Sequence, residues 1–149
     1  MKARDLMTRS PAAVTPHEPI ARAAEIMHDL DVGIVPVVDN QSSKRLLGVI
    51  TDRDITVRCV AKKHGFGCSV KDHMTSQYLD TVHSEDDAST VISLMEREQV
   101  RRIPVVTGDN RLEGIIAQAD LARKLGPKEP LKVEEVLERV SAAHASLSG

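Results

Sequence analysis

Aromatic residues are nearly absent from this sequence: they make up 1% of it, as Phe66 and Tyr78, and there is no tryptophan. Proteins that bind single-stranded nucleic acid stack bases on aromatic side chains, so that class is disfavoured. The net charge of −2, with no basic block, also argues against nucleic acid as a partner. The two cysteines, Cys59 and Cys68, are too few for a four-cysteine zinc site, and we expect them to be reduced.

Long hydrophobic runs are missing as well. No apolar stretch approaches the roughly 18 residues that a membrane span requires, and no apolar segment of a secretory signal follows residues 1–5. We therefore expect a cytoplasmic protein with no membrane partner. The 149 residues are 41% hydrophobic and 28% charged, which is a globular composition with enough length for its own core.

The sequence contains an internal duplication. Landmark residues recur at spacings of 66 to 68 positions: Met27 and Met95, Pro36 and Pro104, Gly48 and Gly114, Asp54 and Asp120. A period this long that occurs twice predicts two halves facing each other rather than a solenoid. We place repeat 1 at residues 1–63, a linker at 64–69, repeat 2 at 70–126 and a tail at 127–149.

Each half is predicted to form a β-α-β-β-α unit after a short helical turn, which spans residues 3–7 in the first copy and 70–74 in the second. The two main helices have start signals, with Thr15 and Ser84 as the expected N-caps. Strands are expected at 34–38 and 103–106. Each carries a proline, which indicates an edge position or a strand start. Closing helices are expected to begin at Asp52 and Gln118.

The tail is predicted to contain an amphipathic helix. Val133, Val136, Leu137 and Val140 fall on one stripe at helical spacing. We expect that stripe to cover a sheet edge or to pack at a dimer interface.

The segment from Gly48 to Asp54 is the strongest candidate site. Thr51 and Asp54 have the spacing of a capping box, in which case they serve only to start a helix. The same geometry suits a ligand, because a helix N-terminus with a hydroxyl favours a phosphate and a carboxylate can accept bonds from a ribose diol. Gly48 would allow a ligand or a backbone segment to approach closely. The residues alone leave both interpretations open.

The duplication, the Gly-h-h-Thr-x-x-Asp segment and the Ile-Val-Pro-Val-Val segment resemble a tandem pair of cystathionine β-synthase (CBS) domains, called a Bateman module, over residues 3 to 125. The resemblance implies an α+β fold in which two βαββα repeats pack face to face with pseudo-two-fold symmetry, plus the C-terminal helix. It also implies that Thr51 and Asp54 bind the phosphate and ribose of an adenosine nucleotide. In the second copy Ala117 replaces the hydroxyl residue, so Asp120 could hold only a ribose.

Sites of this family are built across the two copies, and the resemblance therefore adds residues from the second half. Arg101 and Arg102 correspond to Gly33 and Ile34 of the first copy. Paired arginines suit phosphate oxygens, although a solvated surface patch is the alternative. Further contacts are expected from the backbone near residues 78–82, with Leu79 among them, and from Val100 as an apolar wall.

The remaining candidates for chemistry are weak. The six histidines share no metal-ligand spacing, so surface positions are expected and no metal site is predicted. Cys59 is expected to be a small core residue. There is no GxSxG, P-loop or HExxH motif, and no nucleophile, base and orienting group fall into an arrangement typical of an enzyme.

The favoured function is therefore a non-enzymatic, ligand-sensing regulatory module. It would bind AMP, ADP, ATP or a related molecule between its repeats, require no cofactor, form a homodimer and modulate a separate protein. The alternative is a structural or interaction dimer whose nucleotide sites are degenerate and empty, which the replacement at Ala117 supports.

Overall fold

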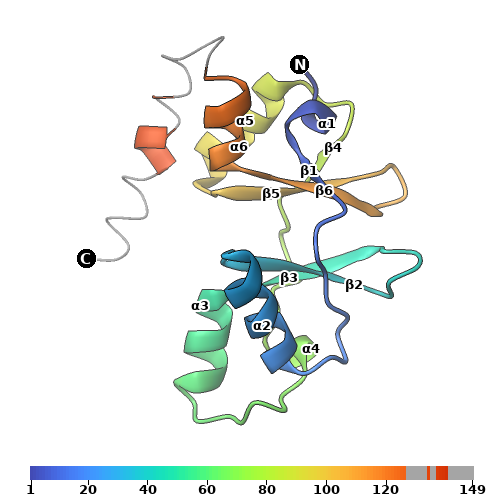
Figure 1. The fold of residues 1–149 in the computed structure, drawn as a ribbon, viewed down its shortest axis with the longest axis vertical. Helices are drawn as coiled ribbons and strands as arrows, with labels where there is room; N and C mark the ends of the chain where they lie inside the picture. The colour runs from blue at the N-terminus through green and yellow to red at the C-terminus, as the bar shows by residue number, and fades with distance from the viewer. Residues whose placement is uncertain (127–133, 135–136, 141–149) are drawn as a thin grey trace. The chain divides into compact units, whose positions relative to one another are not determined.

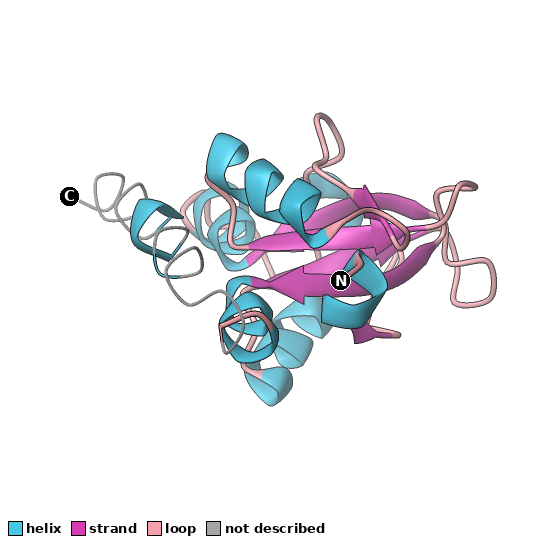
Figure 2. Cartoon of the chain, turned by 90° about the horizontal axis from the view of Figure 1, so that it is seen from above, coloured by secondary structure: helices cyan, strands magenta, loops and turns pink. Residues whose placement is uncertain are grey.

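The computed structural model describes residues 1–126, 134 and 137–140, and the chain in it forms two compact units (Figure 1). Unit 1 contains Met1–Ser10, Asp80–Gly108 and the described residues from Glu113 onward. Unit 2 contains Pro11–Leu79 and Asp109–Leu112. The first ten residues thus belong with the second half of the sequence. The predicted α+β class and the tandem repeats are confirmed, with helices and strands mixed along the chain (Figure 2).

Unit 1 is built on a four-stranded sheet with strand order β1-β6-β5-β4. Its strands are β1 (Thr8–Arg9), β4 (Val82–His83), β5 (Arg102–Val106) and β6 (Leu112–Ala117). Its helices α1 (Ala3–Leu6), α5 (Ala88–Glu98) and α6 (Gln118–Lys124) lie on one side of that sheet (Figure 1). Fully buried residues from the sheet and the helices, among them Met95, Ile103 and Ile116, form a single core.

Unit 2 repeats the arrangement with shorter pairing. Its strands β2 (Ile34–Val38) and β3 (Leu46–Thr51) are antiparallel. Its helical elements are α2 (Ile20–Leu30), α3 (Asp52–Asp54), which continues as the π-helical segment η1 (Ile55–Val60), and α4 (Val70–His73). Single bridges add Val14 beside β2 and Thr75 beside β3, at the places that β4 and β1 hold in unit 1. A second core, which includes Val14, Ile50 and Val70, lies in this unit.

The short helix that leads into each repeat docks on the main helix of the other repeat. In unit 1 the N–H of Ala3 donates to the carbonyl of Asp86 at 2.8 Å, and the N–H of Ala88 donates to the carbonyl of Met1 at 2.9 Å. In unit 2 the N–H of Val70 donates to the carbonyl of Glu18 at 2.9 Å, and the N–H of Ile20 donates to the carbonyl of Cys68 at 2.7 Å.

This reciprocal exchange of backbone hydrogen bonds between each short helix and a main helix explains why the predicted helix starts were wrong. Helices α2 and α5 begin at Ile20 and Ala88, several residues after Thr15 and Ser84. The first N–H of each helix is already bonded to the docked segment, so no side-chain cap is needed there. The residues before each helix form a turn instead, in which a carboxylate accepts a backbone N–H three residues earlier, as Glu18 does from Thr15 at 2.6 Å.

Pro104 does not mark a sheet edge, whereas Pro36 lies in a two-stranded sheet with a single further bridge beside it. β5 lies between β6 and β4, and Pro104 is its third residue, so the edge prediction was wrong for this strand. The short strand β4 pairs only with Val105 and Val106, so the missing N–H of Pro104 removes no bond of that ladder. Pro36 has a similar setting, because Val14 pairs beside it and donates its N–H to the Pro36 carbonyl at 3.0 Å.

The tail prediction is tested at two positions. Val140 is buried in the core of unit 1, and Leu137 is half-buried against the same core. Both lie on the predicted apolar stripe, which therefore covers that core at these positions. Val133 and Val136 lie outside the described residues. In the part of the chain that the structure describes, no helix combines the length and the apolar character needed to cross a bilayer.

Gly48 is required by the close approach of backbone rather than by a ligand. A Cβ at this position would lie 2.5 Å from the carbonyl oxygen of Thr75. Thr75 exchanges two backbone hydrogen bonds with Val49, at 2.8 and 2.9 Å, so its backbone is fixed beside β3. Gly114 has the corresponding place in unit 1, where a Cβ would lie 2.8 Å from the carbonyl oxygen of Thr8.

We predict that Gly48→Ala lowers the free energy of unfolding by about 2 kcal/mol, because the added methyl group forces the Thr75 segment away from β3. Chemical denaturation measures the change. Gly108→Ala is the matched control, since a Cβ there meets nothing within 4 Å and no described glycine has a positive φ. Equal stabilities of the two variants would contradict the assignment.

Candidate functional site

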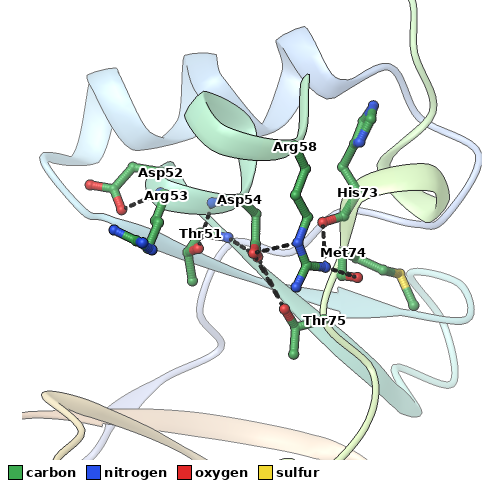
Figure 3. Close-up of polar contacts among 8 residues, drawn as sticks. All are labelled: Thr51, Asp52, Arg53, Asp54, Arg58, His73, Met74 and Thr75. Atoms are coloured by element: carbon green, nitrogen blue, oxygen red, sulfur yellow. Dashed lines mark hydrogen bonds and ion pairs between the residues drawn. The ribbon is translucent and has the colours of Figure 1, made fainter. Parts of the chain in front are cut away.

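Thr51 and Asp54 form the capping box that their spacing allows. Thr51 ends β3 with an extended backbone, and the chain turns helical at the next residue. Its hydroxyl oxygen accepts the N–H of Asp54 at 3.0 Å, and the Asp54 carboxylate accepts the N–H of Thr51 at 3.0 Å (Figure 3). The two side chains are therefore held side by side by reciprocal bonds.

The Asp54 carboxylate is buried, with 8% of the residue exposed, and it has further partners. The Thr75 hydroxyl donates to it at 3.3 Å, and Nε of Arg58 lies 3.6 Å from Oδ1 (Figure 3). Arg58 also donates to the Met74 carbonyl at 3.3 Å. These donors offset the cost of burying the negative charge.

The site keeps some capacity for a ligand. A carboxylate offers about four lone-pair positions, and a hydroxyl that accepts one bond can still donate its own proton. Thr51 is half-buried, and its neighbours Asp52 and Arg53 are exposed. The capping box therefore positions the hydroxyl and the carboxylate without using the hydroxyl proton of Thr51.

The second copy has the same backbone and only part of the chemistry. Ala117 has φ −103° and ψ 157°, close to the φ −110° and ψ 161° of Thr51. The Asp120 carboxylate accepts the N–H of Ala117 at 2.7 Å and pairs with Arg123 at 2.7 Å. The alanine methyl group cannot accept the N–H of Asp120, so the reciprocal bond is missing.

The other predicted site residues fall in both units. Leu79 belongs to unit 2 with Thr51 and Asp54, whereas Val100, Arg101, Arg102 and Asp120 belong to unit 1.

The backbone supports the alignment of Arg101 with Gly33. Within unit 1 the Arg101 carbonyl accepts the N–H of Gln118, the first residue of α6, at 2.8 Å. Gly33 makes the equivalent bond with Asp52 at 2.9 Å in unit 2, which supports the correspondence of Gly33 with Arg101. Arg101 is exposed, and Val100 is half-buried against the core of its unit.

Sequence reasoning missed two partners of Asp54 and misplaced one histidine. Arg58 could have been found from its i+4 spacing to Asp54 on a helix. Thr75, 21 residues away, is brought there only by the docking of α4. His73 was expected at the surface, but 4% of it is exposed because α4 packs against η1. The expectation that Cys59 is a small core residue is confirmed, at 2% exposed.

We predict that Thr51→Ala lowers the free energy of unfolding by about 1 kcal/mol, and that Ala117→Thr raises it by a similar amount. The two positions share one backbone conformation, so each substitution removes or adds the same capping bond. Denaturation curves of the two variants and of the wild type provide the comparison. Changes of the same sign would show that the caps do not control these helix starts.

Comparison with known proteins finds a family and solved structures that share this architecture. The pattern of the CBS domain matches residues 3–60 and 70–127. Hypoxic response protein 1 of Mycobacterium tuberculosis (strain ATCC 25618 / H37Rv) is 32% identical over 123 residues, which cover 83% of this chain and 84% of that protein. The crystal structure of Hypoxic Response Protein I with two coordinated zinc ions has a TM-score of 0.73 at 31% identity, and the match covers 83% of this chain and 98% of that one.

Two further solved structures contain adenosine compounds. CBSX2 in complex with AMP has a TM-score of 0.71 at 26% identity, with 83% of this chain and 95% of that one covered. The CBS domain pair of protein MJ0100, in complex with 5′-methylthioadenosine and S-adenosyl-L-methionine, has a TM-score of 0.73 at 25% identity, with 86% and 98% covered. With both halves matched by one domain pattern, this chain belongs to the CBS domain family and carries two tandem CBS domains.

Proposed function

We propose that this protein is a regulatory module that binds an adenosine-containing ligand, with AMP as the first candidate, through Thr51 and Asp54. The observation that carries the proposal is the capping box, which holds a hydroxyl and a carboxylate three residues apart in a fixed geometry. A prearranged pair loses little side-chain freedom when a ligand binds. The AMP complex of CBSX2 and the adenosyl complexes of MJ0100 support this class of ligand.

The two groups suit different parts of such a molecule. In the capping box the Thr51 hydroxyl acts only as an acceptor, so its O–H group can still donate to a phosphate oxygen. The Asp54 carboxylate is an acceptor, which a ribose diol can use through its two hydroxyl protons. Arg58 and Thr75 also contact that carboxylate and restrain its orientation.

Residues of the second copy extend the proposal. Arg101 and Arg102 would bind phosphate oxygens through their guanidinium groups, with Val100 and Leu79 as apolar contacts for the base. Asp120 could accept bonds from a ribose, but Ala117 offers no hydroxyl to a phosphate. We therefore propose one complete site and one incomplete site.

Regulation requires a ligand that binds two states of the protein with different affinities. We propose that the ligand shifts such an equilibrium in a homodimeric, cytoplasmic module that acts on a separate protein and catalyses no reaction itself. The competing function is an interaction module that binds no nucleotide. The three donors already present around Asp54, from Thr51, Thr75 and Arg58, favour that alternative.

We predict that the wild type binds AMP in isothermal titration calorimetry and that Asp54→Ala weakens this binding at least tenfold, since a charged hydrogen-bond acceptor is lost. Thr51→Ser keeps a hydroxyl and should bind nearly as well as the wild type, whereas Thr51→Ala should not. Circular dichroism establishes that each variant is folded.

A wild type that binds none of AMP, ADP, ATP and S-adenosylmethionine would contradict the proposal. If sedimentation then showed a concentration-dependent dimer, the interaction module would be the better description. Equal AMP affinity in Asp54→Ala and the wild type would place the ligand elsewhere.

A further inference from the structure

Three side chains of the kind that bind transition metals converge in unit 2. They are distinct from Thr51 and Asp54 but lie on neighbouring elements. Cys59 lies on η1, Cys68 lies in the segment between η1 and α4, and His73 is the last residue of α4. Their ligand atoms all lie within 4.8 Å of one another. Cys59 and His73 are buried and Cys68 is half-buried.

The His73 ring carries an unsatisfied nitrogen. Its Nε2 atom is buried, with no hydrogen-bond partner, and is the sole side-chain atom of that kind in the described part of the chain. Native proteins rarely leave a buried polar atom unpaired, so each such atom calls for an explanation such as a bound ion. Here the nitrogen belongs to a group that also contains two thiols.

The donor set selects the class of metal. Two thiolates and a neutral imidazole are the ligands that zinc takes in structural sites, whereas magnesium and calcium prefer oxygen. Both cysteines are free thiols. The Cys59 thiol lies 3.8 and 3.9 Å from the carbonyl oxygens of His64 and Gly65, and it also contacts Cys68, the second proposed ligand. The long carbonyl contacts of Cys59 are weak, so a metal ion can replace them.

We propose that Cys59, Cys68 and His73 bind a zinc ion, with His64 as the fourth ligand. A tetrahedral zinc ion keeps sulfur and nitrogen ligands about 3.5 to 3.8 Å apart, so the present separations of up to 4.8 Å close with small side-chain rotations. The His64 ring is exposed, and its centroid lies 5.3 Å from that of His73. Two imidazoles on one tetrahedral zinc ion place their centroids about 5 Å apart.

The backbone between the ligands is already ordered by hydrogen bonds. The N–H of His64 donates to the Cys59 carbonyl at 3.0 Å, and the N–H of Cys68 donates to the Gly65 carbonyl at 3.3 Å. The Cys68 carbonyl accepts the N–H of Ile20, which ties this segment to the start of α2. A cavity of about 530 Å³ beside α2 and η1 reaches Cys59 and His64 and gives an ion access.

The ion would join η1 to α4. Arg58, next to Cys59, pairs with Asp54 and points a guanidinium nitrogen at the His73 carbonyl, 3.5 Å away. The zinc site would thus stabilise the contact between two elements that hold the Asp54 carboxylate in place. This role does not require that the protein bind a nucleotide.

The test uses the full chain without a histidine tag, purified under reducing conditions without chelator. We expect elemental analysis to find one zinc ion per chain. After removal of zinc, cobalt(II) should bind stoichiometrically and give the visible and near-ultraviolet absorption of tetrahedral thiolate-bound cobalt. Cys59→Ser, Cys68→Ser and His73→Gln should each weaken cobalt binding at least tenfold, and His64→Gln should weaken it less.

His83→Gln is the matched control, because His83 is an exposed residue of β4 in unit 1 and is not among the proposed ligands; it should bind cobalt as the wild type does. Should the cysteine variants fail to fold, the wild type alone decides, since zinc must raise its melting temperature and a chelator must lower it. The proposal is overturned if the folded, fully reduced protein takes up no zinc or cobalt. It is also overturned if Cys59 and Cys68 form a disulfide whose reduction creates no metal binding, or if the Cys59→Ser/Cys68→Ser variant binds cobalt as tightly as the wild type.

Discussion

The reciprocal docking of the two short leading helices is the interaction on which both units depend. The backbone N–H groups at the start of α1 and α4 donate to carbonyls just before a main helix. The residue two positions before each short helix supplies a carbonyl to the first N–H of that main helix. The segment that follows each leading helix then pairs beside the strand that carries Gly48 or Gly114. A side chain at either glycine would collide with that segment. The docking of the short helices therefore requires glycine at both positions.

The exchange also completes the candidate ligand site. Thr75 follows α4 and donates its hydroxyl to Asp54, a residue of the preceding repeat. Asp54 therefore serves a structural role at the position where we propose ligand binding. The two roles are compatible because a carboxylate has more lone pairs than the helix start requires. The change from Thr51 to Ala117 removes a helix cap together with the hydroxyl that we propose as a ligand donor.

The helical segment after Asp54 contacts both the candidate ligand site and the proposed metal site. It carries Arg58, which orients the Asp54 carboxylate, and Cys59, which faces Cys68 and His73. Segments of π-helix often occur at functional sites, and η1 is such a segment. An ion at the cysteines and a ligand at Asp54 would act on the same stretch of backbone.

Local sequence patterns were enough to predict the duplication, the strands around Pro36 and Pro104, the capping box at Thr51 and its loss at Ala117. These features depend on spacing and on residues close together in the chain, which local patterns report directly. The folded chain was needed to show where α2 and α5 begin, which backbone segment approaches Gly48, and that His73 is buried beside two cysteines. Each of those outcomes depends on hydrogen bonds or packing with a segment docked from elsewhere in the chain. Local propensity contains no information on such partners, because their contribution exists only after the chain has folded.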